Sequence, residues 1–177
     1  LKNLLIGSEG TLGIITSTIL KTFPIPEDPI SIFLSINNLA DVLFVYDKIS
    51  REFSERILAF ELIKITGIDF IEETGFTIKN PFNKKTNWKV LIEIDVNIGS
   101  INLREIIENT FYDLFLKNKI VEVFFATNID QRNDFWKIRE LIPAANRKKG
   151  SICSNDISVP IEKIPEVIKK LDNSIYL

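Results

Sequence analysis

The sequence contains 177 residues, 45% of them hydrophobic, which is enough for one domain with a substantial core. Its 22 basic and 24 acidic residues nearly cancel, so composition gives no support for a nucleic-acid-binding face. No apolar run approaches the roughly 18 residues of a membrane span, and no segment has the pattern of a secretory signal. The single cysteine cannot form an internal disulfide, which favours a reducing, cytoplasmic location.

Two residue types are absent from the sequence. There is no methionine, not even at position 1, which indicates a piece of a longer chain. There is also no histidine, the commonest general base near neutral pH and the commonest metal ligand. Any histidine-dependent chemistry is therefore expected outside these residues.

Three of the seven glycines lie close together near the N-terminus, in the stretch LLIGSEGTLGIIT at 4–16. The apolar and β-branched residues around them predict strand, glycine turn and strand over 4–22. The pattern Gly-x-x-Gly-x-x-Gly is neither the G-x-G-x-x-G dinucleotide fingerprint nor a Walker loop. Two interpretations stay open: a tight turn that uses the positive φ of glycine, or a main-chain surface that a flat or anionic group can approach closely.

A stretch with three prolines in six positions follows, and it predicts a stiff linker over 24–30 between residues 1–23 and a domain over 31–177. In that domain, hydrophobic periodicity predicts the following elements. Strands are expected at 31–36, 56–63, 88–96, 121–126 and 151–159, and helices at 39–50, 66–74, 102–115, 130–142 and 161–171. Two β-α-β units in this order predict an α+β fold, a ferredoxin-like antiparallel sheet with helices packed on one face.

Three details sharpen this prediction. Pro143 lies inside a helical pattern, so we expect a kink or a break near 142–143. Glu61 and Glu93 alternate with apolar residues in strands and are expected to face solvent. The helix at 102–115 is expected to bury one apolar face. That face comprises Leu103, Ile106, Ile107, Phe111, Leu114 and Phe115.

The segment LIGSEGTLGIIT at 5–16 resembles the signature that closes the FAD-binding domain of the FAD-linked oxidases. This flavoprotein family includes D-lactate dehydrogenase, glycolate oxidase subunits and D-2-hydroxyglutarate dehydrogenase. Later segments resemble its cap domain in the same order: ILAFELI at 57–63, FWKIRELIPAA at 135–145 and DISVPIEKIP at 156–165. The resemblance implies that 1–23 is the tail of an FAD-binding domain and that 31–177 is part of the substrate, or cap, domain. It also implies FAD as the cofactor, contacted largely through the main chain of Gly7, Ser8, Glu9, Gly10, Gly13 and Ile14.

The resemblance implies that Arg139 holds the substrate carboxylate, which a planar guanidinium binds through two parallel hydrogen bonds. The alternative is a surface arginine paired with a nearby acid. Ser154 stands where the D-2-hydroxyglutarate branch has a lysine, so a second substrate carboxylate would lose its counter-charge. This departure favours a monocarboxylate such as lactate or glycolate, or else indicates decay of function. Cys153 is interpreted as a small buried filler, and Asp156 as a turn cap or a substrate-orienting group.

The function implied is that of a fragment of an FAD-dependent 2-hydroxy-acid dehydrogenase, of the D-lactate or glycolate type, which transfers hydride from the substrate carbon to flavin. In the family, the base and any metal ligands come from a later histidine-rich segment. We therefore expect no catalytic residue and no metal site here, and a chain that alone binds FAD poorly and is inactive. The alternatives are a non-catalytic ferredoxin-like interaction module or a degenerate gene product. The electron acceptor stays unknown, and exposed apolar surface makes self-association an expectation.

Overall fold

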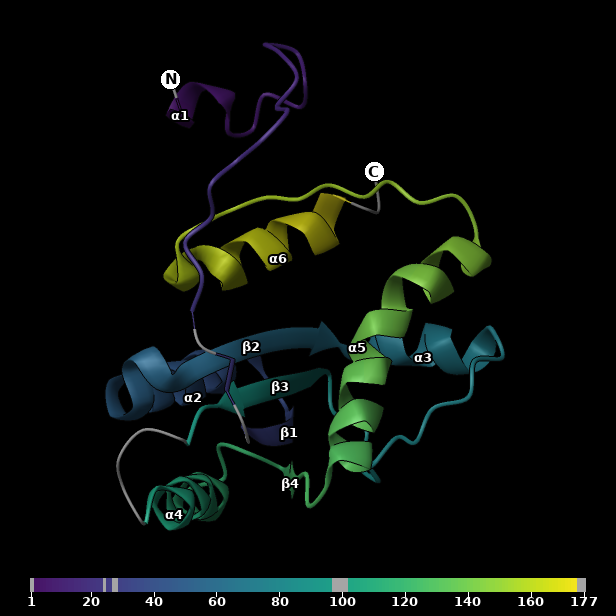
Figure 1. Cartoon of the computed structure of the whole chain (residues 1–177). Coiled ribbons are helices and arrows are strands. Elements are labelled where there is room, and N and C mark those ends of the chain that lie inside the picture. The colour runs from purple at the N-terminus through teal and green to yellow at the C-terminus, as the bar shows by residue number, and fades with distance from the viewer. Residues whose placement is uncertain (1, 24, 27–28, 97–101, 175–177) are drawn as a thin grey trace.

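The computed structural model describes residues 2–23, 25–26, 29–96 and 102–174. Figure 1 shows a four-stranded sheet with helices on both sides of it and an N-terminal segment that extends away from it. The elements are, in chain order, α1 (Lys2–Leu5), β1 (Ile30–Ile36), α2 (Leu39–Phe53), η1 (Ser54–Arg56), β2 (Ile57–Lys64), α3 (Ile65–Glu73), β3 (Trp88–Ile94), α4 (Leu103–Leu116), β4 (Glu122–Phe125), α5 (Ile129–Lys149), η2 (Ile161–Lys163) and α6 (Ile164–Ser174).

The strands are ordered β2-β3-β1-β4, and every neighbouring pair is antiparallel. Helix α2 connects β1 to β2, and helix α4 connects β3 to β4, so each connection passes over the strand that lies between. This is the topology of the ferredoxin-like fold. The predicted α+β class and antiparallel sheet are confirmed, and α2 and α4 supply the predicted helical layer on one face.

Alternate residues of the two central strands form the core beneath α2 and α4. From β1 and β3, the even-numbered residues point into this cluster, together with apolar residues such as Val45 and Phe111 of the two helices. A second cluster lies on the other face, where Phe33 and Leu91 contact α3 and α5. Both central strands are therefore buried along their whole length, and the expectation that β3 is only half-buried is wrong.

Side-chain caps fix where the two long helices begin. The Oδ1 of Asn38 accepts a hydrogen bond from the Asp41 N–H at the start of α2, at 2.9 Å. In the same way, Asn128 accepts from the Gln131 N–H at 2.9 Å where α5 begins. Each cap satisfies one of the N–H groups that a first helical turn leaves without a partner.

The N-terminal segment differs from its prediction. Instead of two strands over 4–22, it forms the short helix α1 followed by a chain without regular structure through residue 23. The apolar side chains of this segment are exposed, Ile14 to 91% and Ile19 fully. A β-strand needs a neighbour for its N–H and C=O groups, and no described strand of this chain lies beside the segment. The high β-propensity of residues 4–22 is therefore not enough by itself to make them strands.

Helix α5 continues through Pro143 without a break, and Figure 1 shows it changing direction in its C-terminal half, which fits the kink expected near 142–143. Helix α4 departs from its prediction. On α4, Ile106 and Phe115 are 49% and 41% exposed, so the buried face is narrower than predicted. Among the described residues, none of the helices combines the length and apolar character that a membrane crossing requires.

Candidate active-site cleft

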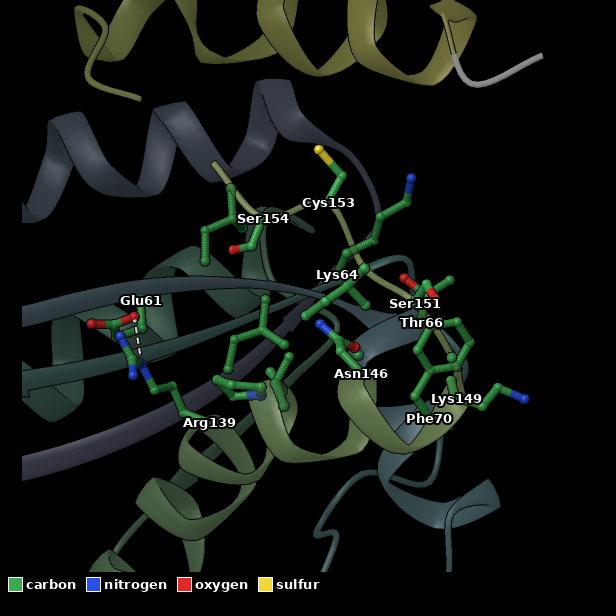
Figure 2. A pocket seen from close by; sticks show the side chains of 17 residues that line it. Glu61, Lys64, Thr66, Phe70, Arg139, Asn146, Lys149, Ser151, Cys153 and Ser154 are labelled. Carbon is green, nitrogen blue, oxygen red and sulfur yellow. Dashed lines mark hydrogen bonds and ion pairs between the residues drawn. The ribbon is translucent and has the colours of Figure 1, made fainter. Parts of the chain in front are cut away.

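A cleft of about 820 Å³ lies where the end of β2 meets α3, the C-terminal half of α5 and the segment after it (Figure 2). Two regions that are distant in sequence, β2 with α3 and α5 with the segment after it, thus form its wall. Its polar or charged side chains come from all of them: Glu61, Lys64, Thr66, Arg139, Asn146, Lys149, Ser151, Cys153 and Ser154. Apolar residues including Ile142 and Phe70 form the remainder of the surface.

Arg139 and Glu61 form an ion pair on one wall of this cleft. The Nε of Arg139, on α5, donates to the Oε2 of Glu61, on β2, at 3.1 Å. Both side chains remain accessible, at 44% and 33%. The two interpretations of Arg139 from the sequence are therefore compatible: the arginine is paired with an acid, and it also lines a cleft large enough for a small organic acid. Glu61 faces this cleft rather than open solvent.

Ser154 lines the same cleft as Arg139, although it belongs to the segment that follows α5. The strand expected over 151–159 is wrong, because this segment has no regular structure and pairs with none of the described strands. Figure 2 shows the side chain of Ser154 between Glu61 and Cys153. Cys153 is exposed, so its interpretation as a buried filler is wrong. The backbone here is not covered by another element, which explains the exposure. Asp156, two residues beyond Ser154, is exposed and does not line the cleft.

Two lysines add positive charge to the lining, and each is already engaged. Lys64 Nζ lies 2.8 Å from a carboxylate oxygen of Asp172 on α6. Lys149 Nζ lies 2.5 Å from a carboxylate oxygen of Glu73 on α3. Every cationic side chain that the described cleft presents therefore has a carboxylate partner.

Helix α5, which carries Arg139, is attached to the sheet by a buried carboxylate. Glu93 of β3 is only 4% exposed. Its Oε1 accepts from Arg132 Nε at 2.6 Å, from Ser31 Oγ at 2.5 Å and from Trp136 Nε1 at 2.8 Å, while its Oε2 accepts from Arg132 Nη2 at 3.0 Å. The expectation that Glu93 faces solvent is wrong, because α5 covers this face of the sheet.

The electrostatics of Glu93 follow from these contacts. Burial alone would raise the pKa of the Glu93 carboxyl, because it disfavours the charged form. Hydrogen bonds from Arg132, Ser31 and Trp136, with the charge of Arg132, outweigh that effect and hold the pKa of Glu93 below its usual range. Glu93 is therefore a permanently charged anchor for α5 near neutral pH.

Sequence analysis missed this anchor, although a usable signal was present. Arg132, Trp136 and Arg139 are spaced by four and three residues, so they lie on one face of a helix. All three donate hydrogen bonds to acids at odd-numbered strand positions, Arg132 and Trp136 to Glu93 and Arg139 to Glu61. A helix that presents two arginines and a tryptophan to a strand face containing carboxylates is a pattern that predicts contact between them.

Lys89 is a second buried charged group on the same face of the sheet. It is 1% exposed, and its Nζ donates to Thr86 Oγ1 at 2.7 Å and lies 4.2 Å from the centre of the Phe82 ring. Burial lowers the pKa of Lys89, and the charges of Glu122 and Asp69 oppose that shift. These contacts attach the 76–87 segment to the sheet, away from the cleft lining.

The glycine segment was predicted to approach FAD through its main chain. Gly7, Gly10 and Gly13 all have positive φ, as does Glu9, at 50°. No atom lies within 4 Å of where a Cβ would stand on these three glycines. This open main chain fits close approach by a flat group. Among the residues predicted to contact FAD, Ser8 is half-buried and Ile14 is exposed. The described residues contain no group of three or more His, Cys, Asp or Glu side chains placed to hold a metal ion.

Comparison with known proteins identifies the family. The model of the "FAD linked oxidases, C-terminal domain" family matches residues 25–175. The chain belongs to this family. The suspected resemblance to FAD-linked oxidases is thereby confirmed, and the ferredoxin-like sheet described above is the fold of a member.

Individual relatives within this group are dehydrogenases of 2-hydroxy acids. The D-2-hydroxyglutarate dehydrogenase of Arabidopsis thaliana mitochondria is 29% identical over 171 residues, which cover 97% of this chain and 30% of that protein. The D-lactate dehydrogenase of Anaerostipes hadrus is 29% identical over 175 residues, which cover 95% of this chain and 36% of that protein. The rat D-2-hydroxyglutarate dehydrogenase is 24% identical over 168 residues, which cover 95% of this chain and 31% of that protein. This chain spans about one third of the length of these relatives.

Proposed function

We propose that this chain supplies the substrate-binding part of an FAD-dependent dehydrogenase that acts on a small 2-hydroxy acid of the D-lactate or glycolate type. One observation carries the proposal. Arg139 and Ser154, the two residues that the family resemblance assigns to substrate, line the same cleft although they belong to different segments. That cleft is large enough for a small hydroxy acid and contains a cation that can bind its carboxylate.

In this proposal the guanidinium of Arg139 binds the substrate carboxylate and fixes the orientation of the substrate. The hydroxyl of Ser154 donates one hydrogen bond to the substrate and carries no charge. Glu93 acts at a distance, because it holds α5 against the sheet and so fixes the position of Arg139. Substrate orientation, rather than proton transfer, is the contribution of the described residues.

We further propose the division of the chain at the proline-rich linker, with residues 1–23 belonging to the FAD-binding domain and residues 31–177 to the cap. FAD, when bound, supplies the hydride acceptor. The open main chain of residues 7–14 is available for contact with it. A cytoplasmic location is part of the proposal as well, whereas the Arabidopsis and rat relatives are mitochondrial by name.

The decisive experiment is a flavin test on the longest natural chain that contains this segment. The purified protein is expected to show the visible absorbance of bound flavin, and D-lactate or glycolate is expected to bleach it. A well-folded, colourless protein that cannot be reconstituted with FAD would overturn the proposal. It would favour the interaction module or the degenerate gene product instead.

The role of Arg139 has its own test in the same protein. Arg139→Gln keeps a hydrogen-bonding side chain but removes the charge, so the KM of the hydroxy acid is expected to rise at least about tenfold, as for loss of a charge-assisted hydrogen bond. Arg51→Gln is the matched control, because Arg51 forms a similar pair with Asp47 on the exposed side of α2. An unchanged KM in Arg139→Gln would show that the carboxylate binds elsewhere.

A further inference from the structure

Glu61 occupies a distinct position among the charged residues of the cleft. Of the carboxylates that pair with cleft cations, Asp172 and Glu73 lie outside the lining, whereas Glu61 is itself part of it. Among the described residues, Glu61 is the only acidic side chain that lines the cleft. A ligand seated beside Arg139 is therefore also seated beside a negative charge.

The geometry of the ion pair determines what remains for a ligand. The hydrogen bond from Arg139 to Glu61 uses Nε, at 3.1 Å. The two terminal nitrogens of the guanidinium then form the pair of parallel donors that a carboxylate prefers. Glu61 thus restrains the plane of the guanidinium without occupying those terminal donors.

A second carboxylate on the ligand would find no free counter-charge in the described lining. Lys64 and Lys149 are each committed to another acid, and Ser154 is neutral. The charge nearest to Arg139 is that of Glu61, which repels a second carboxylate. In a partly solvated cleft, one unit charge several ångströms away changes affinity by about three- to tenfold.

We propose that Glu61 is a specificity-determining residue, which orients Arg139 for a monocarboxylate and disfavours 2-hydroxy acids that carry a second carboxylate. This inference rests on the proposed function, because it requires Arg139 to bind the substrate. It assigns to Glu61 both a positioning contact and a selective charge.

The test compares Glu61→Gln with Glu61→Ala in the flavin-loaded, longest natural chain, using D-lactate and D-2-hydroxyglutarate. The amide oxygen of glutamine can still accept from Arg139 Nε, so Glu61→Gln removes the charge and keeps the orienting contact. The KM of D-2-hydroxyglutarate is expected to fall about three- to tenfold relative to that of D-lactate. Glu61→Ala removes the contact as well, so the KM of D-lactate is expected to rise in that variant.

Asp47→Asn serves as the control for charge removal. Asp47 accepts from Arg51 Nε at 2.9 Å on α2, which gives the same chemistry outside the cleft. In Asp47→Asn, the ratio of the KM of D-2-hydroxyglutarate to the KM of D-lactate is expected to match that of the unmodified protein. A loss of folding stability alone does not change this ratio, so the readout is specific for a role at the site.

The outcomes separate this inference from the proposed function. If Arg139→Gln leaves both KM values unchanged, or if the flavin-loaded chain oxidises none of D-lactate, glycolate and D-2-hydroxyglutarate, the proposed function fails and this inference fails with it. If Arg139→Gln raises KM but Glu61→Gln leaves the ratio of the two acids unchanged, only the role of Glu61 is overturned. If Arg139→Gln raises KM and Glu61→Gln lowers the KM of D-2-hydroxyglutarate relative to that of D-lactate, the proposed function and the role of Glu61 are both supported.

Discussion

The two faces of the sheet come from the same strands, yet they are built from different chemistry. The core beneath α2 and α4 is built from buried apolar side chains, with Thr110 of α4 as a buried polar residue at its border. The opposite face combines apolar residues such as Phe33 with buried polar groups, among them Glu93 and Lys89. The first face stabilises the fold, and the second positions α5 and the cleft. Among the described residues, the two buried charged side chains, Glu93 and Lys89, thus lie on the face whose partner helix carries the candidate site.

The largest effect is expected from a cavity on the apolar face. Phe111 is fully buried on α4 and packs edge-to-face on Phe125, with ring centres 5.9 Å apart. Phe111→Ala is expected to lower the free energy of unfolding by about 3–5 kcal/mol, measured by urea denaturation of the 177-residue chain. Phe115→Ala, on the same helix at 41% exposure, is the control and is expected to lose much less. Equal losses would contradict the assignment of this face as the main core.

On the polar face, removal of the Glu93 carboxylate is expected to have the next largest effect. Glu93→Ala eliminates four hydrogen bonds, two of them from the partly buried Arg132. The expected loss is about 2–4 kcal/mol of unfolding free energy. In the active protein, the KM of the substrate is expected to rise because α5 carries Arg139. If stability falls while KM is unchanged, Glu93 supports the fold without positioning the site.

Acid should distinguish the two faces, because the polar one contains Glu93, a buried carboxylate whose pKa is lowered by its hydrogen bonds. The folded-state pKa of Glu93 lies below its unfolded value, so its stabilisation is complete above about pH 4.3 and is lost as the pH falls through the folded pKa. Glu93→Gln is expected to flatten this part of the stability curve. Glu166→Gln is the control: hydrogen bonds from Lys170 lower its pKa too, but at an exposed site where solvent screens the interaction. An unchanged slope in Glu93→Gln would contradict the proposed anchor.

Much of this architecture was predictable because local periodicity and burial agreed. Strands β1 to β4 and helices α2 to α4 were all expected close to their observed positions, since their apolar residues recur with period 2 or 3.6. The same rule failed for 4–22, where strand-like composition has no described partner strand. It also failed for Glu93, because alternation identifies the side of a strand that a residue faces and not what covers that side.

The site was predictable only in part, for a related reason. Arg139 and Ser154 came from the family resemblance, and their presence in one cleft required the fold. The pairing of Arg139 with Glu61 joins residues 78 positions apart. No local pattern contains such a contact, although the helical spacing of Arg132 and Arg139 indicated that both face the sheet.

The smallest effect is expected where α3 meets α5 beside the cleft. A Cβ on Gly67 would lie 3.2 Å from Ile142 Cδ1, which is the tip of a half-buried side chain. Because Ile142 borders the open volume of the cleft, it can shift by a few tenths of an ångström. The gain in helix propensity should then prevail, so Gly67→Ala is expected to raise the free energy of unfolding by about 0.5 kcal/mol. A loss of 1 kcal/mol or more, on the order of an overpacked core, would show that α3 and α5 are packed as rigidly as the apolar face.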